Sequence, residues 1–339
     1  MKKTILFLLF YTTLFSQGKN SDYFEYHKQI NRAEELYFLE NKVDNALNIY
    51  DEVFQNYDFV FLKDLLIAAQ IAKFNGKPFE GYILRSFEFG FKIDDLKKIH
   101  HFQDLHKSFS TDKVKINIFK SARQKYLDSI DYEYLDYIYN LAVQDQIDKY
   151  KKDYYDRLNN SFTRFINKVE QKGFPGEKLM GLTDTLIFKE RGLPFKDINS
   201  RSRKNKITKH FLFTNKFDFV IIMPFLLHHG CASFMYKDLF LSEIKKGNMH
   251  PQDLAYINDF YKSQSSFLPY YCSNIKFKGI YTSSPRIGGW LTDKNEIENA
   301  NKLRKELYMT SYEVFLKKRE FVLKDKFVLN FGFLYSARL

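Results

Sequence analysis

Two adjacent histidines, His228 and His229, are the residues of this sequence best suited to acid–base chemistry. They follow an apolar run over residues 217–227, so we expect their imidazoles to be partly buried. An imidazole titrates near neutral pH, and a carboxylate beside it can orient the ring as a general base. We predict that Asp145 or Asp156, on a neighbouring helix, orients His229 in this way. The alternative is that His229 is a hydrogen-bonded structural residue of a buried helix end.

No strong catalytic or cofactor motif accompanies these histidines. The sequence has no His-Glu-x-x-His, no Gly-rich phosphate loop and no Gly-x-Ser-x-Gly. His100, His101 and His106 lie close together, but their spacing does not place them on one helical face, and no carboxylate pair stands at metal-ligand spacing. We therefore predict no metal site and no cofactor.

The charge balance does not favour nucleic acid as a partner. The 339 residues include 53 Lys+Arg against 41 Asp+Glu, which gives a formal charge of +12. Only 12 of these basic residues are Arg, the side chain whose planar fork reads bases and phosphates best. The densest basic stretch, residues 201–209, is expected to be a solvated loop; the alternative is an anion-binding patch.

The first residues have the order of a secretory signal peptide. Lys2 and Lys3 precede an apolar run over residues 4–15, and the small residues of Ser16–Gly18 follow. The run is shorter than the ~20 residues that span a bilayer. We predict that residues 1–18 are cleaved near Ser16–Gly18, that the protein is periplasmic or secreted, and that the mature chain has no transmembrane segment. In such a compartment Cys231 and Cys272 either form a disulfide or are buried small hydrophobic residues.

Residues 19–110 are predicted to form paired amphipathic helices. Breaks are predicted at Asn41 and at residues 75–78. The positions expected to pack between the helices carry small, aliphatic or aromatic residues: Ile30, Ala33, Tyr37, Ala46, Tyr50, Val53, Leu65, Ala69, Ala72 and Gly81. This pattern resembles tetratricopeptide repeats, although Glu34 stands where that family prefers Gly. The resemblance implies a concave face that binds a protein or peptide. The alternative is an ordinary pair of helical hairpins.

Residues 111–325 are predicted to form a second helical domain, and residues 326–339 a tail. Apolar residues recur at helical spacing in two stripes: Leu135, Ile138, Leu141 and Ala142, then Leu158, Phe162, Phe165, Ile166 and Val169. Gly173 is expected to end the second of these helices, and Pro251 to begin another. Asp293 and Thr310 have capping-box spacing to a later Glu. Residues 274–282 and 327–334 are the candidate extended segments. The predicted fold is mainly α, with at most a small strand element.

Several short motifs of the second domain occur in a recognisable order. They are Asp145-Gln146, Asp156 with Asn159, Gly173-Phe174-Pro175, His228-His229, Tyr271-Cys272-Ser273-Asn274 and a closing helix that contains Arg304. This order resembles an uncharacterised domain family of bacterial exported proteins, and the resemblance covers somewhat over half of the chain. The family's stretches read Asp-Gln, Asp-x-x-Asn, Gly-Trp-Pro, Gln-His-Ala-Asp and Tyr-Gly-Thr-Gln.

The resemblance adds candidate ligand-binding residues and sharpens the disulfide hypothesis. The matched motifs add Gln146, Asn159, Tyr271 and Asn274 as residues that can offer hydrogen bonds to a ligand. Cys231 stands where the family has an acidic residue, and Cys272 stands where it has Gly. Because both cysteines occupy motif positions, the resemblance implies a bridge between the two segments. The family has no established activity, so the resemblance implies no function.

Two hypotheses about function follow from these features. The first is a non-enzymatic exported protein that offers a helical surface to another protein or peptide. The second is a hydrolase or ligand-binding domain built on His228, His229, Asp145 and Asp156, with a divalent metal as an option. The two repeat-like units and the lack of a recognisable nucleophile–base pair favour the first hypothesis.

Overall fold

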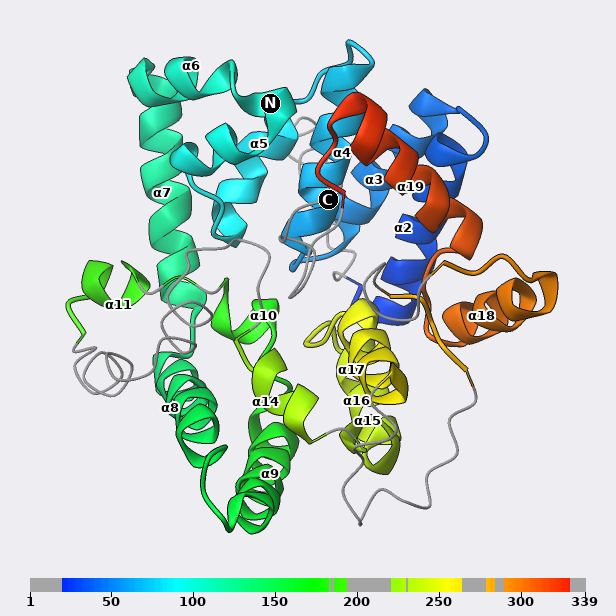
Figure 1. The fold of residues 1–339 in the computed structure, drawn as a ribbon. Coiled ribbons are helices and arrows are strands. Elements are labelled where there is room, and N and C mark those ends of the chain that lie inside the picture. The colour runs from blue at the N-terminus through cyan, green and yellow to red at the C-terminus, as the bar shows by residue number, and fades with distance from the viewer. Residues whose placement is uncertain are drawn as a thin grey trace, which may run out of the picture.

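The protein is mainly α-helical, as the sequence predicts. The computed structural model describes residues 20–182, 184, 186–193, 221–229, 231–263, 279–283 and 290–329, and these residues contain no β-strand. None of their helices combines the length and the apolar character that crossing a membrane requires. Figure 1 shows the helices, in chain order from blue to red.

The first part of the chain folds into two helical pairs. These are α2 (Tyr23–Phe38) with α3 (Val43–Asn56), and α4 (Leu62–Phe74) with α5 (Glu80–Ser86). The Asp22 side chain caps α2 by accepting from the Phe24 amide at 3.0 Å. The predicted breaks are confirmed, because Asn41 has a φ of 54° after α2 and Gly76 has a φ of 66° after α4.

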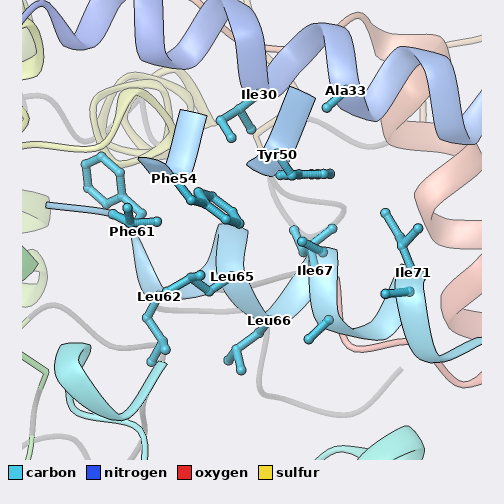
Figure 2. Close-up of a cluster of buried hydrophobic side chains, with 14 of the residues drawn as sticks. Ile30, Ala33, Tyr50, Phe54, Phe61, Leu62, Leu65, Leu66, Ile67 and Ile71 are labelled. Atoms are coloured by element: carbon cyan, nitrogen blue, oxygen red, sulfur yellow. The ribbon is translucent and has the colours of Figure 1, made fainter. Parts of the chain in front are cut away.

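The predicted packing positions form the first hydrophobic core. Ile30 and Ala33 of α2 face Tyr50 and Phe54 of α3, and side chains of α4 close the cluster from the other side (Figure 2). Ala33, Ala46, Ala69 and Ala72 are completely buried, so the helices approach closely at these residues.

Gly81 does not pack as predicted. It is exposed, and a Cβ built at this position would meet nothing within 4 Å.

Short helices lead from the first core to the second. They are η1 (Phe87–Phe89), η2 (Ile93–Lys98), η3 (His100–Phe102), α6 (Leu105–Thr111) and α7 (Lys113–Ser129). Asp112 caps α7 through the amides of Val114 and Lys115. The last turns of α7 contribute Tyr126 and Leu127 to the second core.

The second core is built from long and short helices in the middle of the chain. They are α8 (Tyr132–Asp148), α9 (Tyr154–Lys172), α10 (Glu177–Met180), α11 (Leu186–Glu190), α14 (Met223–His228), α15 (Ala232–Met235), α16 (Lys237–Lys245) and α17 (Pro251–Ser263). The predicted apolar stripes of α8 and α9 are all buried. Gly173 ends α9 with a φ of 96°, and Pro251 is the first residue of α17, both as predicted.

The last two helices return to the beginning of the chain. They are α18 (Lys294–Glu306), capped by Asp293 as predicted, and α19 (Tyr312–Asp325). The cap of α19 is Ser311 and not the predicted Thr310, because the Ser311 hydroxyl accepts from the Val314 amide. Figure 1 shows α19, in red, beside α2, in blue.

A buried glutamine fastens the segment after α19 to the first core. The Gln70 side chain donates to the Val328 carbonyl and accepts from the Val328 amide, each at 2.8 Å. Phe327 and Leu329 are buried in the same core as α2, α3 and α4. The last described residues are therefore part of the first helical unit in space, although they are the most distant from it in sequence.

Candidate functional site

His228 lies beside Asp145, and both residues belong to the predicted site. The imidazole Nδ1–H of His228 donates to Asp145 Oδ2 at 2.6 Å. His228 is the last residue of α14, and Asp145 lies in the last turns of α8. Asp145 also accepts from the hydroxyl of Tyr154 and from the side-chain amide of Gln146, each at 3.0 Å. The carboxylate is almost completely buried and these three donors satisfy it, so it fixes the orientation of His228.

His229 has other partners than the prediction gave it. Its ring stacks on Phe162, with centroids 3.7 Å apart and planes 9° from parallel, and its Nε2 lies 3.2 Å from Asn159 Oδ1. Burial lowers the pKa of His229 to about 4, so the imidazole is neutral at physiological pH. The prediction that Asp145 or Asp156 orients His229 is wrong: Asp145 holds His228, and Asp156 is exposed on α9.

The remaining predicted site residues are only partly placed. Tyr271, Asn274 and Cys272 lie outside the described residues. Cys231 is buried directly before α15. Because Cys272 is not described, its disulfide with Cys231 stays a prediction. Among the described residues, no group of three His, Cys, Asp or Glu side chains is arranged to hold a metal ion.

A polar cavity that the sequence did not predict lies where the first and the last helices meet the start of α17. Its volume is about 60 Å³. The residues that line it are His27, Ile30, Asn31, Glu34, Lys63, Asp64, His250, Gln252, Ser283, Arg304, Tyr308, Met309, Thr310, Phe315, Lys318 and Leu329. Several of them, among them Asn31 and Tyr308, are partly exposed, so the cavity is open to solvent. We call it the junction cavity.

Lys63 and His250 form the centre of the junction cavity. Lys63 Nζ donates to His250 Nδ1 and to Gln252 Oε1, both at 3.2 Å, and the Gln252 amide donates to the same His250 Nδ1 at 3.0 Å. Because Nδ1 accepts twice, a neutral His250 must carry its proton on Nε2. The pKa of His250 is lowered well below its usual value by burial and by the charge of Lys63, so the ring is neutral.

His27 adds a buried polar atom without a partner. The side chain is 2% exposed, and its Nε2 makes no hydrogen bond with any described residue. The ring packs edge-on against His250, with centroids 4.9 Å apart, and burial lowers its pKa well below the usual value. A buried polar atom left in this state costs about 1–3 kcal/mol of stability.

The carboxylates of the junction cavity are already occupied. Glu34 forms an ion pair with Lys318, and Asp64 accepts from the Tyr26 hydroxyl at 2.8 Å. Burial raises the pKa of Asp64 to about 6, against the opposing effects of Lys63 and of that hydrogen bond. Both carboxylates of the cavity therefore have a partner. His27 Nε2 has no partner, and the His250 Nε2–H and the third proton of Lys63 have no acceptor, among the described residues.

Known proteins add nothing to the geometry of either site. No protein-family model, curated protein or solved structure matches this chain. The resemblance to the exported domain family therefore stays a prediction.

The sequence carried one weak signal for the junction cavity. Lys63 and Asp64 are two adjacent charged residues inside the otherwise apolar run over residues 59–69. Charged residues at such positions are seldom buried without partners, which indicates a polar site in the core. Nothing in the sequence indicates that His27 and His250 meet there, since they are far apart along the chain.

Glu177 connects the two cores. Its raised pKa makes the stability of this connection depend on pH. Its carboxylate accepts from the amide of Leu62, the first residue of α4, at 2.7 Å. Burial raises the pKa of Glu177 from 4.5 to about 8, with Asp64 and Asp253 acting in the same direction and the Leu62 amide and Lys63 against it. The folded state therefore favours the protonated carboxyl, and its contribution to stability is lost as the pH rises from about 4.5 to 8.

We predict that Glu177→Gln becomes more stable relative to the wild type as the pH rises from 5 to 8. The amide oxygen still accepts from Leu62 but does not titrate. The difference in free energy of unfolding should change by at least about 1.4 kcal/mol, the value of one pH unit of pKa difference. Urea unfolding at pH 5, 6.5 and 8 measures it. Glu52→Gln, at an exposed residue of α3, is the control and should stay parallel to the wild type. Parallel curves for Glu177→Gln would contradict the prediction.

Proposed function

We propose that the protein binds a small anionic group in the junction cavity. The observation that carries this proposal is a set of unused hydrogen-bonding groups. His27 with its unpartnered Nε2, Lys63 with its third proton and His250 with its Nε2–H line one cavity whose carboxylates are engaged. His27 donates from Nε2 when that nitrogen carries the proton. A ligand that completes them must bring acceptor oxygens. Carboxylate and phosphate groups are the acceptors that suit ammonium and imidazole donors best.

The size of the cavity limits the ligand. One water needs roughly 10–15 Å³ of such space, so about 60 Å³ holds a group of four or five non-hydrogen atoms. This matches an acetate ion, an inorganic phosphate ion or the charged end of a longer molecule that reaches out through the exposed side. The proposed ligand is therefore a carboxylate or phosphate group that lies against Lys63, His27 and His250.

The charge of an anion would also reverse the electrostatics of the cavity. Burial lowers the pKa of Lys63, and Lys63 in turn lowers the pKa values of His27 and His250. A bound anion stabilises the protonated form of each of these groups. Binding should therefore be coupled to the uptake of protons near neutral pH.

We predict that acetate or inorganic phosphate binds the wild type at one site and that His27→Phe binds it at least about tenfold more weakly. Phe keeps the ring contacts of His27 with Tyr26, Phe61 and His250 but lacks the nitrogen. Calorimetric titration in two buffers of different ionisation enthalpy measures the affinity and the proton uptake. Lys63→Met should also weaken binding.

The ligand-free stability of His27→Phe separates binding from architecture. Because Phe removes a buried atom without a partner, the free variant should be more stable than the wild type by about 1 kcal/mol or more. His100→Phe, at an exposed imidazole outside the cavity, is the control and should leave binding unchanged. Failure of both anions to bind the wild type, or equal binding by His27→Phe, would overturn the proposal.

A second function, docking of a protein or peptide, is favoured by one surface feature. Leu39, Phe74 and Leu323 are about half exposed, with exposed fractions of 48, 46 and 59%. They stand at or near the C-terminal ends of α2, α4 and α19. α19 runs parallel to α2, because Glu34 pairs with Lys318 and Tyr37 packs against Phe321. α4 also runs parallel to α2, because the Tyr26 hydroxyl bonds to Asp64 and the Asn75 side chain to Tyr37. Exposed apolar residues gathered at one end of a helical unit are typical of interaction sites.

We predict that a double variant, Leu39→Lys with Leu323→Lys, loses the partner that the wild type retains. Affinity capture from a fraction of exported proteins, with tagged wild type and variant side by side, measures it. Val114→Lys replaces an equally exposed apolar residue on α7 and should keep the partner. Retention by the double variant would exclude this surface.

Three further parts of the proposal rest on the sequence. We propose that the chain is exported, that residues 1–18 are its signal peptide, and that Cys231 and Cys272 are joined after export. The charge, apolar and small-residue order at the start of the chain supports the first two, and the motif positions of the cysteines support the third. Tetratricopeptide ancestry of the first two helical pairs is likewise supported by the residue pattern of α2–α5.

A further inference from the structure

A second cavity has different lining residues from the junction cavity, although both cavities border α18 and the segment over residues 279–283. It has a volume of about 120 Å³ and is bounded by α15, α17, α18 and the segment over residues 279–281. Its walls are largely apolar, with Leu254, Leu303 and Leu307 among them. Among the described residues that line it, the charged ones are Lys237 and Glu306, and both are exposed.

Ser233 is one of the residues that line this cavity, and its hydroxyl group has no partner among the described residues. The residue is 6% exposed, and its Oγ makes no hydrogen bond with any described residue. Asn258, 7% exposed, is the second polar side chain of the wall and donates to Asp259 Oδ1 at 3.4 Å. A buried hydroxyl of this kind is costly unless something completes its hydrogen bonds.

The walls of the cavity are held in place by an extended network. Asp259 accepts from the Tyr281 amide at 2.7 Å and from the Ser283 amide at 2.8 Å. Arg304 donates to the Tyr281 carbonyl at 2.8 Å, which ties the same segment to α18. The cavity is therefore formed before any ligand arrives, which lowers the cost of binding.

The size of the cavity indicates the ligand. An apolar cavity of about 150 Å³ is known to bind benzene, so 120 Å³ suits a ring of that size or slightly smaller. We propose that this cavity is a separate binding site for a small neutral molecule with one six-membered ring or a branched chain and a single hydroxyl group. The apolar body contacts the leucines, and the hydroxyl bonds to Ser233. This proposal does not depend on the junction cavity.

Phenol and toluene test the proposal, because they have the same shape and differ by one hydroxyl. We expect phenol to bind the wild type saturably at one site, in calorimetric titration. Ser233→Ala should weaken phenol binding about fivefold, the usual effect of one neutral hydrogen bond, and leave toluene binding unchanged. Ser233→Leu should abolish the binding of both molecules, because the larger side chain fills the cavity.

Two controls keep the result interpretable. Ser242→Ala, at an exposed serine of α16, should bind phenol as the wild type does. Circular dichroism and urea unfolding of Ser233→Leu show whether the fold is kept. Absence of saturable phenol binding, equal phenol binding by Ser233→Ala, or phenol binding by a folded Ser233→Leu would each overturn the proposal.

Discussion

The ammonium group of Lys63 is the point on which the arrangement of the two helical units depends. It lies in the first turn of α4, inside the first unit, and donates to His250 and Gln252 at the start of α17 in the second. A desolvated ammonium is unfavourable without such partners, so the two units are held in the one arrangement that supplies them. His27 and Asp64 lie in the same cavity as Lys63, which makes the junction cavity polar.

The two kinds of histidine in the structure show what separates an architectural imidazole from one available to a ligand. His229 stacks on Phe162, and its Nε2 lies within hydrogen-bond distance of Asn159, so packing against α9 fixes its ring. His27 is as deeply buried, yet its Nε2 is left without a partner among the described residues. Buried polar groups in native proteins are generally satisfied, and an exception in a cavity indicates that a ligand completes it. His228 lies between these cases, because Asp145 orients it while part of the ring reaches solvent.

The fold was predictable from the sequence where local rules decide it. The apolar stripe from Leu158 to Val169 defines one helical face, and Asp293 and Pro251 mark helix starts by their own chemistry. The meeting of Asp145 with a histidine was predicted, but the wrong histidine was chosen. The two imidazoles are adjacent in sequence, and the non-helical conformation of His229, with a ψ of 69°, turns it away from the end of α14. The junction cavity was not predictable, because its residues come from six separate segments that only tertiary packing brings together.

The protonation of the cavity imidazoles tests the central claim most directly. Long-range proton–nitrogen correlation spectra of the labelled protein distinguish the two ring nitrogens of each histidine. The account predicts that His250 carries its proton on Nε2 at neutral pH, and that adding acetate or phosphate shifts the Nε2 resonance of His27 while leaving His229 unchanged. A His250 protonated on Nδ1, or a His27 resonance that does not respond to either anion, would contradict it.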